Sequence, residues 1–290
     1  MLTSSVNPSL VHERRERRLI LLLLAPALAV VGCLLVVPLC WLAWQSVRQD
    51  GGFTLAHYAR FFTDDVYWMT FLQTFRIAFI VTAATILLGY PVAYVATGAS
   101  RGWSLLILAM VVLPFWTSVL VRAYAWLILL QRRGLVNTML TDAGLIDAPL
   151  GLVNNEFGTI LATVHILLPF MVLPLYATMR RIPRELMVAG ASLGGTPLHV
   201  FLRVFLPLSL PGMVAGMVLV FVLTLGFYIT PELLGGGRAF MVSMLVSRNI
   251  ELYNEWGAAS SISVVLLACV FVIFRVASLV IPFERIMGAR

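Results

Sequence analysis

Six apolar runs, each long enough to cross a lipid bilayer, constrain this chain more than any other feature of its sequence. A hydrocarbon core about 30 Å thick needs roughly 20 apolar residues in a helix, and lipid offers no partner for an unpaired backbone N–H or C=O group. We therefore expect an all-α integral membrane protein with six transmembrane helices. The runs are Leu19 to Trp44, Thr70 to Thr97, Trp103 to Leu130, Phe157 to Met179, Met213 to Leu234 and Gly257 to Pro282.

The composition agrees with a membrane protein and excludes an ordinary soluble domain. Hydrophobic residues make up 61% of the chain and charged residues only 11%, against about 25% charged residues in soluble proteins. The net charge of +7 comes with 20 basic residues, all of them arginine. In a soluble protein such a charge would favour a nucleic-acid partner, but here the positions of the arginines indicate membrane orientation, and we expect no nucleic-acid partner.

Arginines gather on one side of the expected membrane, which fixes the orientation of the chain. They cluster before the first span and again at Arg180, Arg181 and Arg184, whereas the opposite loops carry more acidic residues than arginines. Because short cytoplasmic segments are enriched in lysine and arginine, both termini are predicted to be cytoplasmic. The expected organisation is a tail at 1–18, a transmembrane domain at 19–283 that includes a cytoplasmic loop at 180–212, and a cytoplasmic end at 284–290, in a bacterial inner membrane. Gly89, Gly98, Gly216 and Gly226 are candidates for close approach between helices.

The long cytoplasmic loop has the pattern of two short helices separated by glycines. Leu186, Ala189, Gly190 and Leu193 follow helical spacing and so share one face. The pair Gly194-Gly195 is expected to end this first helix.

A second short helix is expected to begin directly after the glycines. Thr196 is a plausible N-cap and Pro197 suits the first helical position. The apolar residues that follow repeat the helical spacing, while His199 and Arg203 form a polar face. We expect Pro207 and Pro211 to close this helix-glycine-helix elbow. Periodicity alone is equally compatible with a hairpin that only lies among lipid headgroups. The apolar positions of the second helix are Leu198, Phe201, Leu202 and Phe205.

The residues of this elbow resemble the "EAA" loop of the permeases of binding-protein-dependent ABC importers of type I. The resemblance implies that the elbow docks into a cleft of a cytoplasmic ATPase and transmits its closure to the membrane helices. Val188 stands where that family usually has an acidic residue, and Glu185, nearly one turn earlier, is the candidate for an equivalent charge. The matching positions are Ala189, Gly190, Leu193, Gly194, Pro197, Phe201, Arg203, Leu206, Pro207, Pro211 and Gly212; with Glu185 and Gly195, the first seven of these form the predicted coupling set.

Other segments resemble the spermidine/putrescine-type branch of these permeases, so the resemblance covers most of the chain. It implies a second permease subunit, which in that branch typically forms a heterodimer with the first, together with two copies of an ABC ATPase and a periplasmic solute-binding protein. It also implies that ATP and Mg are bound by the ATPase and that this chain binds no cofactor. The segments are 114–126, 144–147, 165–170 and 226–236.

Ionisable and aromatic groups inside the spans are the candidates for contact with solute, because charges in a membrane usually face a cavity or a partner. Arg122 and Glu232 stand out, with Arg76 near the outer start of the second span. Arg122 and Glu232 are equally compatible with a structural ion pair, and the aromatic residues with anchors at the membrane interface. The predicted substrate path comprises Trp116, Arg122, Tyr124, Phe227, Tyr228 and Glu232.

The identity of the solute stays open at this point. A polyamine suits the resemblance, because carboxylates and aromatic faces hold polycations. Phe227, however, follows Gly226 where polyamine relatives often carry an acid, so an amino acid-like, carboxylate or phosphonate solute is the alternative.

The sequence does not favour an enzyme. The four histidines are scattered, no metal-ligand or catalytic-triad spacing occurs, and a chain without lysine has no phosphate-binding GxxxxGK[ST] loop. We therefore predict neither catalytic nor metal-binding residues. A stand-alone channel or a membrane-embedded transferase are distant alternatives.

Overall fold

The computed structural model describes residues 8–49 and 51–280, with side chains described from residue 23 to 278. The predicted cytoplasmic end at 284–290 and the first residues of the predicted tail lie outside these ranges. The regular secondary structure of the described residues is helical except for a two-strand hairpin, in which β1 (Arg48–Gln49) pairs antiparallel with β2 (Gly52–Phe53). The all-α prediction is confirmed.

Five helices are long and apolar enough to cross a membrane without a break. Each contains most of one predicted span, so five of the six spans are confirmed as helices. They are α1 (Pro8–Ser46), α3 (Asp65–Gly98), α7 (Glu156–Met179), the continuous helix Pro197–Leu225 that contains α9 and α10, and α13 (Trp256–Val280).

The third predicted span is broken, so the prediction of one straight helix from Trp103 to Leu130 is wrong. Its two halves meet at an angle of 100°. Pro114 lies in the short 3-10 turn η1 (Leu113–Trp116), where its missing N–H disfavours a continuous α-helix. The Thr117 hydroxyl then donates a hydrogen bond of 2.7 Å to the Pro114 carbonyl, and Ser118 caps the next helix. The halves are α4 (Arg101–Val112) with η1, and α5 (Val119–Leu130) with α6 (Leu135–Asp142).

The fifth span differs from its prediction at both ends. The helix begins at Pro197 rather than Met213 and ends at Leu225, and α11 (Ile229–Leu234) is a separate short helix. The prediction that Pro207 and Pro211 close the elbow is therefore wrong, because both prolines lie within the continuous helix. A π-helical segment, η2 (Phe201–Phe205), precedes α10 (Leu206–Leu225) and widens the helix just before Pro207, where the proline ring and missing N–H would strain a regular turn.

Helices α3, α7 and α10 pack together as the centre of the molecule, and Met171 of α7 lies fully buried among them. Gly89 of α3 and Gly216 of α10 both approach Met171 so closely that a Cβ would touch its side chain. The prediction of close helix approach is therefore confirmed at these two glycines. It is wrong for Gly98 and Gly226, because a Cβ at either position meets nothing within 4 Å.

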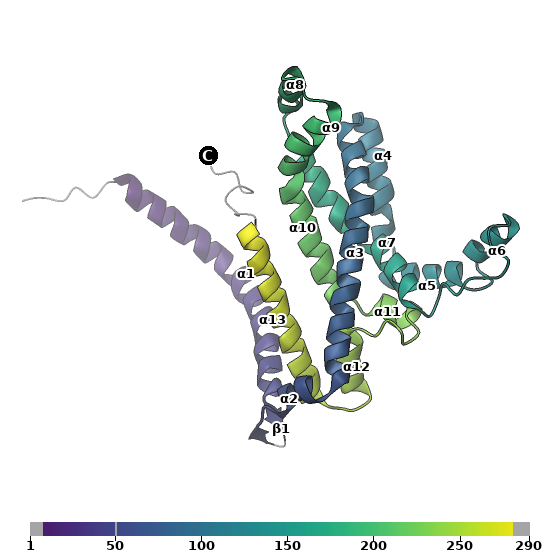
Figure 1. The fold of residues 1–290 in the computed structure, drawn as a ribbon. Helices are drawn as coiled ribbons and strands as arrows, with labels where there is room; N and C mark the ends of the chain where they lie inside the picture. Colours follow the sequence, from purple (N-terminus) through teal and green to yellow (C-terminus); the bar gives the residue numbers. More distant parts are fainter. Residues whose placement is uncertain (1–7, 50, 281–290) are drawn as a thin grey trace, which may run out of the picture.

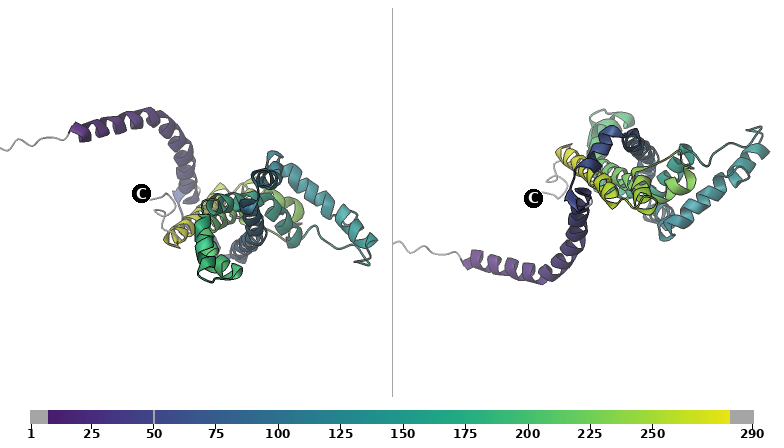
Figure 2. Two further views of the ribbon diagram at one scale, coloured as in Figure 1. Left: turned by 90° about the horizontal axis from the view of Figure 1, so that it is seen from above. Right: turned by 90° about the horizontal axis from the view of Figure 1, so that it is seen from below.

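The helices divide into a central bundle and a peripheral pair (Figures 1 and 2). Helix α1 packs on α13, and the membrane-crossing part of α1 buries none of its residues within this chain. The elbow, which contains α8 (Arg184–Ser192) and α9 (Pro197–Val200), lies at one end of the bundle. The hairpin, α2 (Ala56–Thr63) and α12 (Val242–Glu251) lie at the other end, which is the outer side in the predicted orientation.

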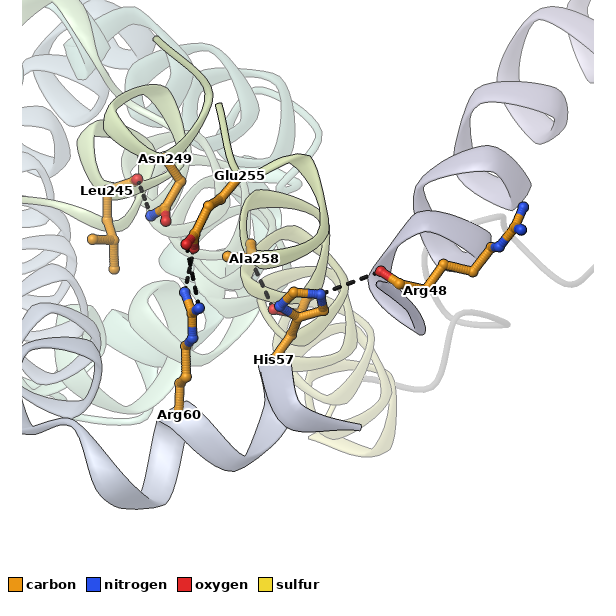
Figure 3. A network of polar contacts seen from close by, with 8 residues as sticks. Arg48, His57, Arg60, Leu245, Asn249, Glu255 and Ala258 are labelled. Atoms are coloured by element: carbon orange, nitrogen blue, oxygen red, sulfur yellow. Dashed lines mark hydrogen bonds and ion pairs between the residues drawn. The ribbon is translucent and has the colours of Figure 1, made fainter. Parts of the chain in front are cut away.

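Polar contacts at the outer end tie α2 to the start of α13 (Figure 3). Arg60 forms an ion pair with Glu255, and this hydrogen bond holds the pKa of the Glu255 carboxyl below its ordinary value. The ring of His57 is buried, contacts the Arg48 carbonyl at 3.3 Å and lies against Gly257, where any side chain would collide with it. These contacts join the hairpin, α2 and α13 into one outer layer.

The contact between α10 and α7 gives a stability prediction at Gly212. A Cβ there would overlap Thr178 and the Pro174 carbonyl, so Gly212→Ala is expected to destabilise the protein by about 1–3 kcal/mol. Thermal unfolding in detergent measures the effect, and Gly98→Ala is the matched control because its Cβ meets open space. Without the close contact, alanine in a helix would be favoured over glycine by about 1 kcal/mol. A stabilised Gly212→Ala protein would therefore contradict the packing.

The Arg60–Glu255 pair gives a pH prediction. Because the pKa of Glu255 is lower in the folded protein than the ordinary value of 4.5, its stabilisation is present above that value and is lost as the pH falls through the folded pKa. Both side chains are more than a third exposed, so Glu255→Gln is expected to lower the free energy of unfolding by only about 0.5 kcal/mol at pH 7. Unfolding temperatures of the wild type and the variant should converge in acid. In a protein that already carries Arg60→Gln, the Glu255→Gln change should lower the free energy of unfolding by less than it does in the wild type. An equal decrease would show that the ion pair is not the source of the stabilisation.

Candidate functional site

The elbow owes its sharp turn to a glycine cap at the end of α8. The Gly194 N–H donates to the Ala191 carbonyl at 2.9 Å, and the Gly195 N–H donates to the Gly190 carbonyl at 3.1 Å. These two bonds form a Schellman motif, which needs a left-handed residue after the last helical turn. Gly194 supplies it with a φ of +86°. The predicted break at the two glycines is confirmed.

Helix α9 starts as the sequence predicts. The Thr196 side chain accepts a hydrogen bond of 3.3 Å from the His199 N–H, and Pro197 occupies the first turn. Val200 is buried against the glycines, because a Cβ at Gly190 or Gly195 would press on its methyl groups. The glycines thus let α8 lie close to α9, which makes the elbow compact.

Aromatic rings fasten the elbow to the bundle. Phe201 packs edge-on against Tyr90 and Tyr94 of α3, with ring centroids 6.1 and 5.6 Å apart, and Phe205 packs on Tyr94 at 5.1 Å. Phe201 was predicted to be a coupling residue, and the structure places it inside the chain's own packing. Any movement of the elbow therefore moves the end of α3 with it.

The opposite side of the elbow is exposed and apolar. Leu193 is 90% exposed and Leu198 is 68% exposed. The predicted coupling residues Glu185, Ala189, Pro197 and Arg203 are exposed on the same elbow. Large apolar side chains that face the aqueous side of a membrane protein indicate a surface that a partner covers.

The predicted substrate-path residues lie at the broken third span and at the break between α10 and α11. Arg122 on α5 is only 7% exposed, its buried Nε atom has no hydrogen-bond partner within the described chain, and its guanidinium lies 5.9 Å from the ring centre of Phe115. No carboxylate of the described residues pairs with it. The Arg122–Glu232 ion pair, offered as one interpretation of the sequence, does not form, because Glu232 is exposed on α11.

The remaining path candidates lie in different surroundings. Helix α5 packs on α11, which brings the elements of Arg122 and Glu232 together even though their charges do not pair. Phe227 packs against the central core at the break between α10 and α11, and its carbonyl accepts a hydrogen bond from Ser243. Trp116, Tyr124 and Tyr228 are exposed.

Two contacts near this region were not predicted from the sequence. Trp126 Nε1 lies 3.2 Å from His165 Nδ1, which joins α5 to α7, and Arg76 pairs with Glu156 at 2.9 Å. Arg76 is thus not a free charge in the membrane. Trp126 and His165 both lie in segments singled out by resemblance, and that was the only signal available for their contact. Within the described ranges, no group of three or more His, Cys, Asp or Glu side chains is placed to hold a metal ion.

Comparison with known proteins agrees with this geometry. The family described as "binding-protein-dependent transport system inner membrane component" matches residues 8–285. The spermidine/putrescine transport system permease protein PotB of Haemophilus influenzae is 33% identical over 251 residues, which cover 83% of this chain and 87% of that protein. The inner membrane ABC transporter permease protein YdcU of Escherichia coli is 34% identical over 277 residues, or 88% of each chain.

Solved structures share the fold at low identity. A chain of a bacterial ABC transporter that imports the acidic polysaccharide alginate matches with a TM-score of 0.66 and 18% identity, covering 94% of this chain and 99% of its own. A chain of the MetNI methionine ABC transporter in an inward-facing conformation matches with a TM-score of 0.56 and 16% identity, covering 75% and 96%. These likenesses support the fold and do not bear on the solute.

Proposed function

Because this chain belongs to the family of binding-protein-dependent transport system inner membrane components, we propose that it forms half of the path by which an ATP-driven importer takes up a polyamine. As a multi-pass inner-membrane permease, it is the non-catalytic kind of subunit.

The exposed apolar face of the elbow is the observation that carries the docking proposal. Leu193 and Leu198 belong to the loop that is predicted to be cytoplasmic, and the chain's own core does not cover them. A cleft on a cytoplasmic ATPase would bury these leucines, and apolar burial gives about 25 cal/mol per Å². The exposed Glu185 and Arg203 flank the face and suit contacts at a polar rim.

The continuity of the elbow with the membrane supports its use as a lever. Helix α9 runs without a break through η2 and α10 to Leu225. A force applied at Pro197 by ATPase closure is therefore carried along one helix to Gly226, near the proposed solute path. Phe201 passes part of that force to α3 through Tyr90 and Tyr94.

ATP and Mg are assigned to the partner ATPase, since this chain has no phosphate-binding loop and no lysine. Two ATPase copies, a second permease and a periplasmic solute-binding protein complete the proposed assembly. Helix α1 supports the permease contact, because its membrane-crossing part buries none of its residues within this chain and leaves an apolar face for another subunit.

The polyamine assignment rests on the relatives named spermidine/putrescine permeases. Glu232 is exposed and has no ion-pair partner within the described chain, so its carboxylate is available to attract a polycation. The unpaired Arg122 favours an anionic solute instead, which makes a carboxylate or phosphonate the second candidate.

The docking proposal predicts that Leu193→Asp separates the permease from its ATPase. A charge at this 90% exposed position would be buried on docking, so the amount of ATPase that co-purifies with the assembled transporter should fall at least about tenfold, or about 1.4 kcal/mol. Leu145→Asp is the matched control, because Leu145 is 71% exposed on the outer side. Undiminished co-purification of the Leu193→Asp protein would exclude this face as the docking surface.

The solute proposal predicts that the cognate periplasmic binding protein binds spermidine or putrescine and that proteoliposomes containing the complete transporter accumulate it. Glu232→Gln should lower the initial uptake rate, whereas Glu251→Gln should not, because Glu251 is also exposed on the outer side but bonds to Ser247. Binding and uptake of a carboxylate or phosphonate with no response to polyamines would replace the first candidate by the second.

A further inference from the structure

A large cavity lies beneath the elbow, on the side of α8 that faces the bundle. Its volume is about 940 Å³, and its walls come from the ends of α3 and α7 and from α8 and α9. Figure 1 shows α8 and α9 at the end of the bundle opposite to the hairpin, which is the cytoplasmic end in the predicted orientation. The cavity therefore lies at the depth where lipid headgroups meet the cytoplasm.

The lining of the cavity combines positive charge with an apolar wall. Arg180 and Arg184 line the cavity together with Tyr94 and Thr97, whereas none of the described lining residues is acidic. Val188 supplies part of the apolar wall at the position where the related permeases usually have an acid. A cavity with two arginines and no carboxylate is complementary to an anion, and arginine binds phosphate oxygens through paired hydrogen bonds.

A strip of exposed apolar residues on α3 leads from the middle of the membrane to this cavity. Leu87, Pro91, Tyr94 and Val95 recur at helical spacing and are exposed, and the last two line the cavity itself. An occupant with a charged head and an apolar tail fits both features at once, because its head meets the arginines while its tail follows the strip.

We infer that this cavity binds an anionic phospholipid, with the headgroup phosphate at Arg180 and Arg184 and an acyl chain along α3. Basic pockets between membrane helices on the cytoplasmic side have the chemistry that such headgroups need. Free phosphate would gain nothing from the apolar wall. A bound lipid fills the space between the elbow and the membrane and so supports the elbow from below.

The lipid site shares Gly195, Pro197 and Phe201 with the predicted coupling set, but not the two leucines on which the docking proposal rests. Leu193 and Leu198, which carry the docking proposal, do not line this cavity. The lipid proposal is therefore independent of the docking proposal, and either can fail alone.

Native mass spectrometry of the full chain in detergent tests the site directly. The protein is titrated with phosphatidylglycerol and with phosphatidylcholine of the same acyl length. Since two arginines face the headgroup, phosphatidylglycerol is expected to bind about tenfold more tightly. Equal binding of the two lipids would overturn the proposal, as would loss of bound phosphatidylglycerol when millimolar inorganic phosphate is added.

Variants of the lining residues test whether the lipid binds in this cavity. Val188→Glu puts a carboxylate in the wall at an exposed position, so it should abolish the preference without disturbing the fold, and Arg180→Gln with Arg184→Gln should do the same. Arg181→Gln is the matched control, because Arg181 is exposed beside these residues but does not line the cavity. A preference that survives Val188→Glu, or that Arg181→Gln removes equally, would show that the lipid is held elsewhere.

Discussion

The close approach of α10 to α7 is the contact on which the rest of the structure depends. Lipid tails are as apolar as leucine, so helices in a membrane gain little from apolar burial and associate through tight packing instead. Gly212 and Gly216 let α10 lie directly against the backbone of α7, and Gly89 lets α3 close on the same residue, Met171. Larger residues at these positions would separate the three helices that carry the elbow.

Two opposite ends of this three-helix core carry different chemistry. At the cytoplasmic end, a glycine cap and two aromatic contacts with α3 make the elbow compact, with one apolar face turned outward and a basic cavity behind it. At the outer end, Arg60 and Glu255 join α2 to α13, and the broken third span places Arg122 beside Phe115. The unbroken helix from Pro197 to Leu225 connects the two ends, so an ATPase and a solute would act on one rigid element.

Periodicity and glycine chemistry made the elbow predictable in detail. Thr196, Pro197 and the two glycines specify their conformations through local hydrogen bonds, which do not depend on distant residues. The ends of the spans were less predictable. Pro207 was expected to stop a helix, but packing of α10 in the core and a π-helical segment carry the helix through it, whereas Pro114 does interrupt its span. The same residue type gave opposite results because its surroundings differ.

The sequence did not predict which residues of distant segments contact one another. Arg122 and Glu232 were similar in expected depth, yet the structure leaves the first buried and unpaired among the described residues and the second exposed. Likewise Gly89 and Gly216 meet a neighbouring helix while Gly98 and Gly226 do not, because only the rotation of each helix decides which face it turns inward.

The sequence by itself determined the membrane class, the five unbroken spans and the local turn of the elbow, and it predicts the orientation. Each follows from the length of an apolar run, the distribution of arginine or the conformational freedom of a single residue. Tertiary structure alone decided the bend of the third span, the extension of the fifth into the elbow and the cavity behind α8. These depend on which helices pack together, and helix contacts in lipid are set by shape complementarity between segments far apart in the chain.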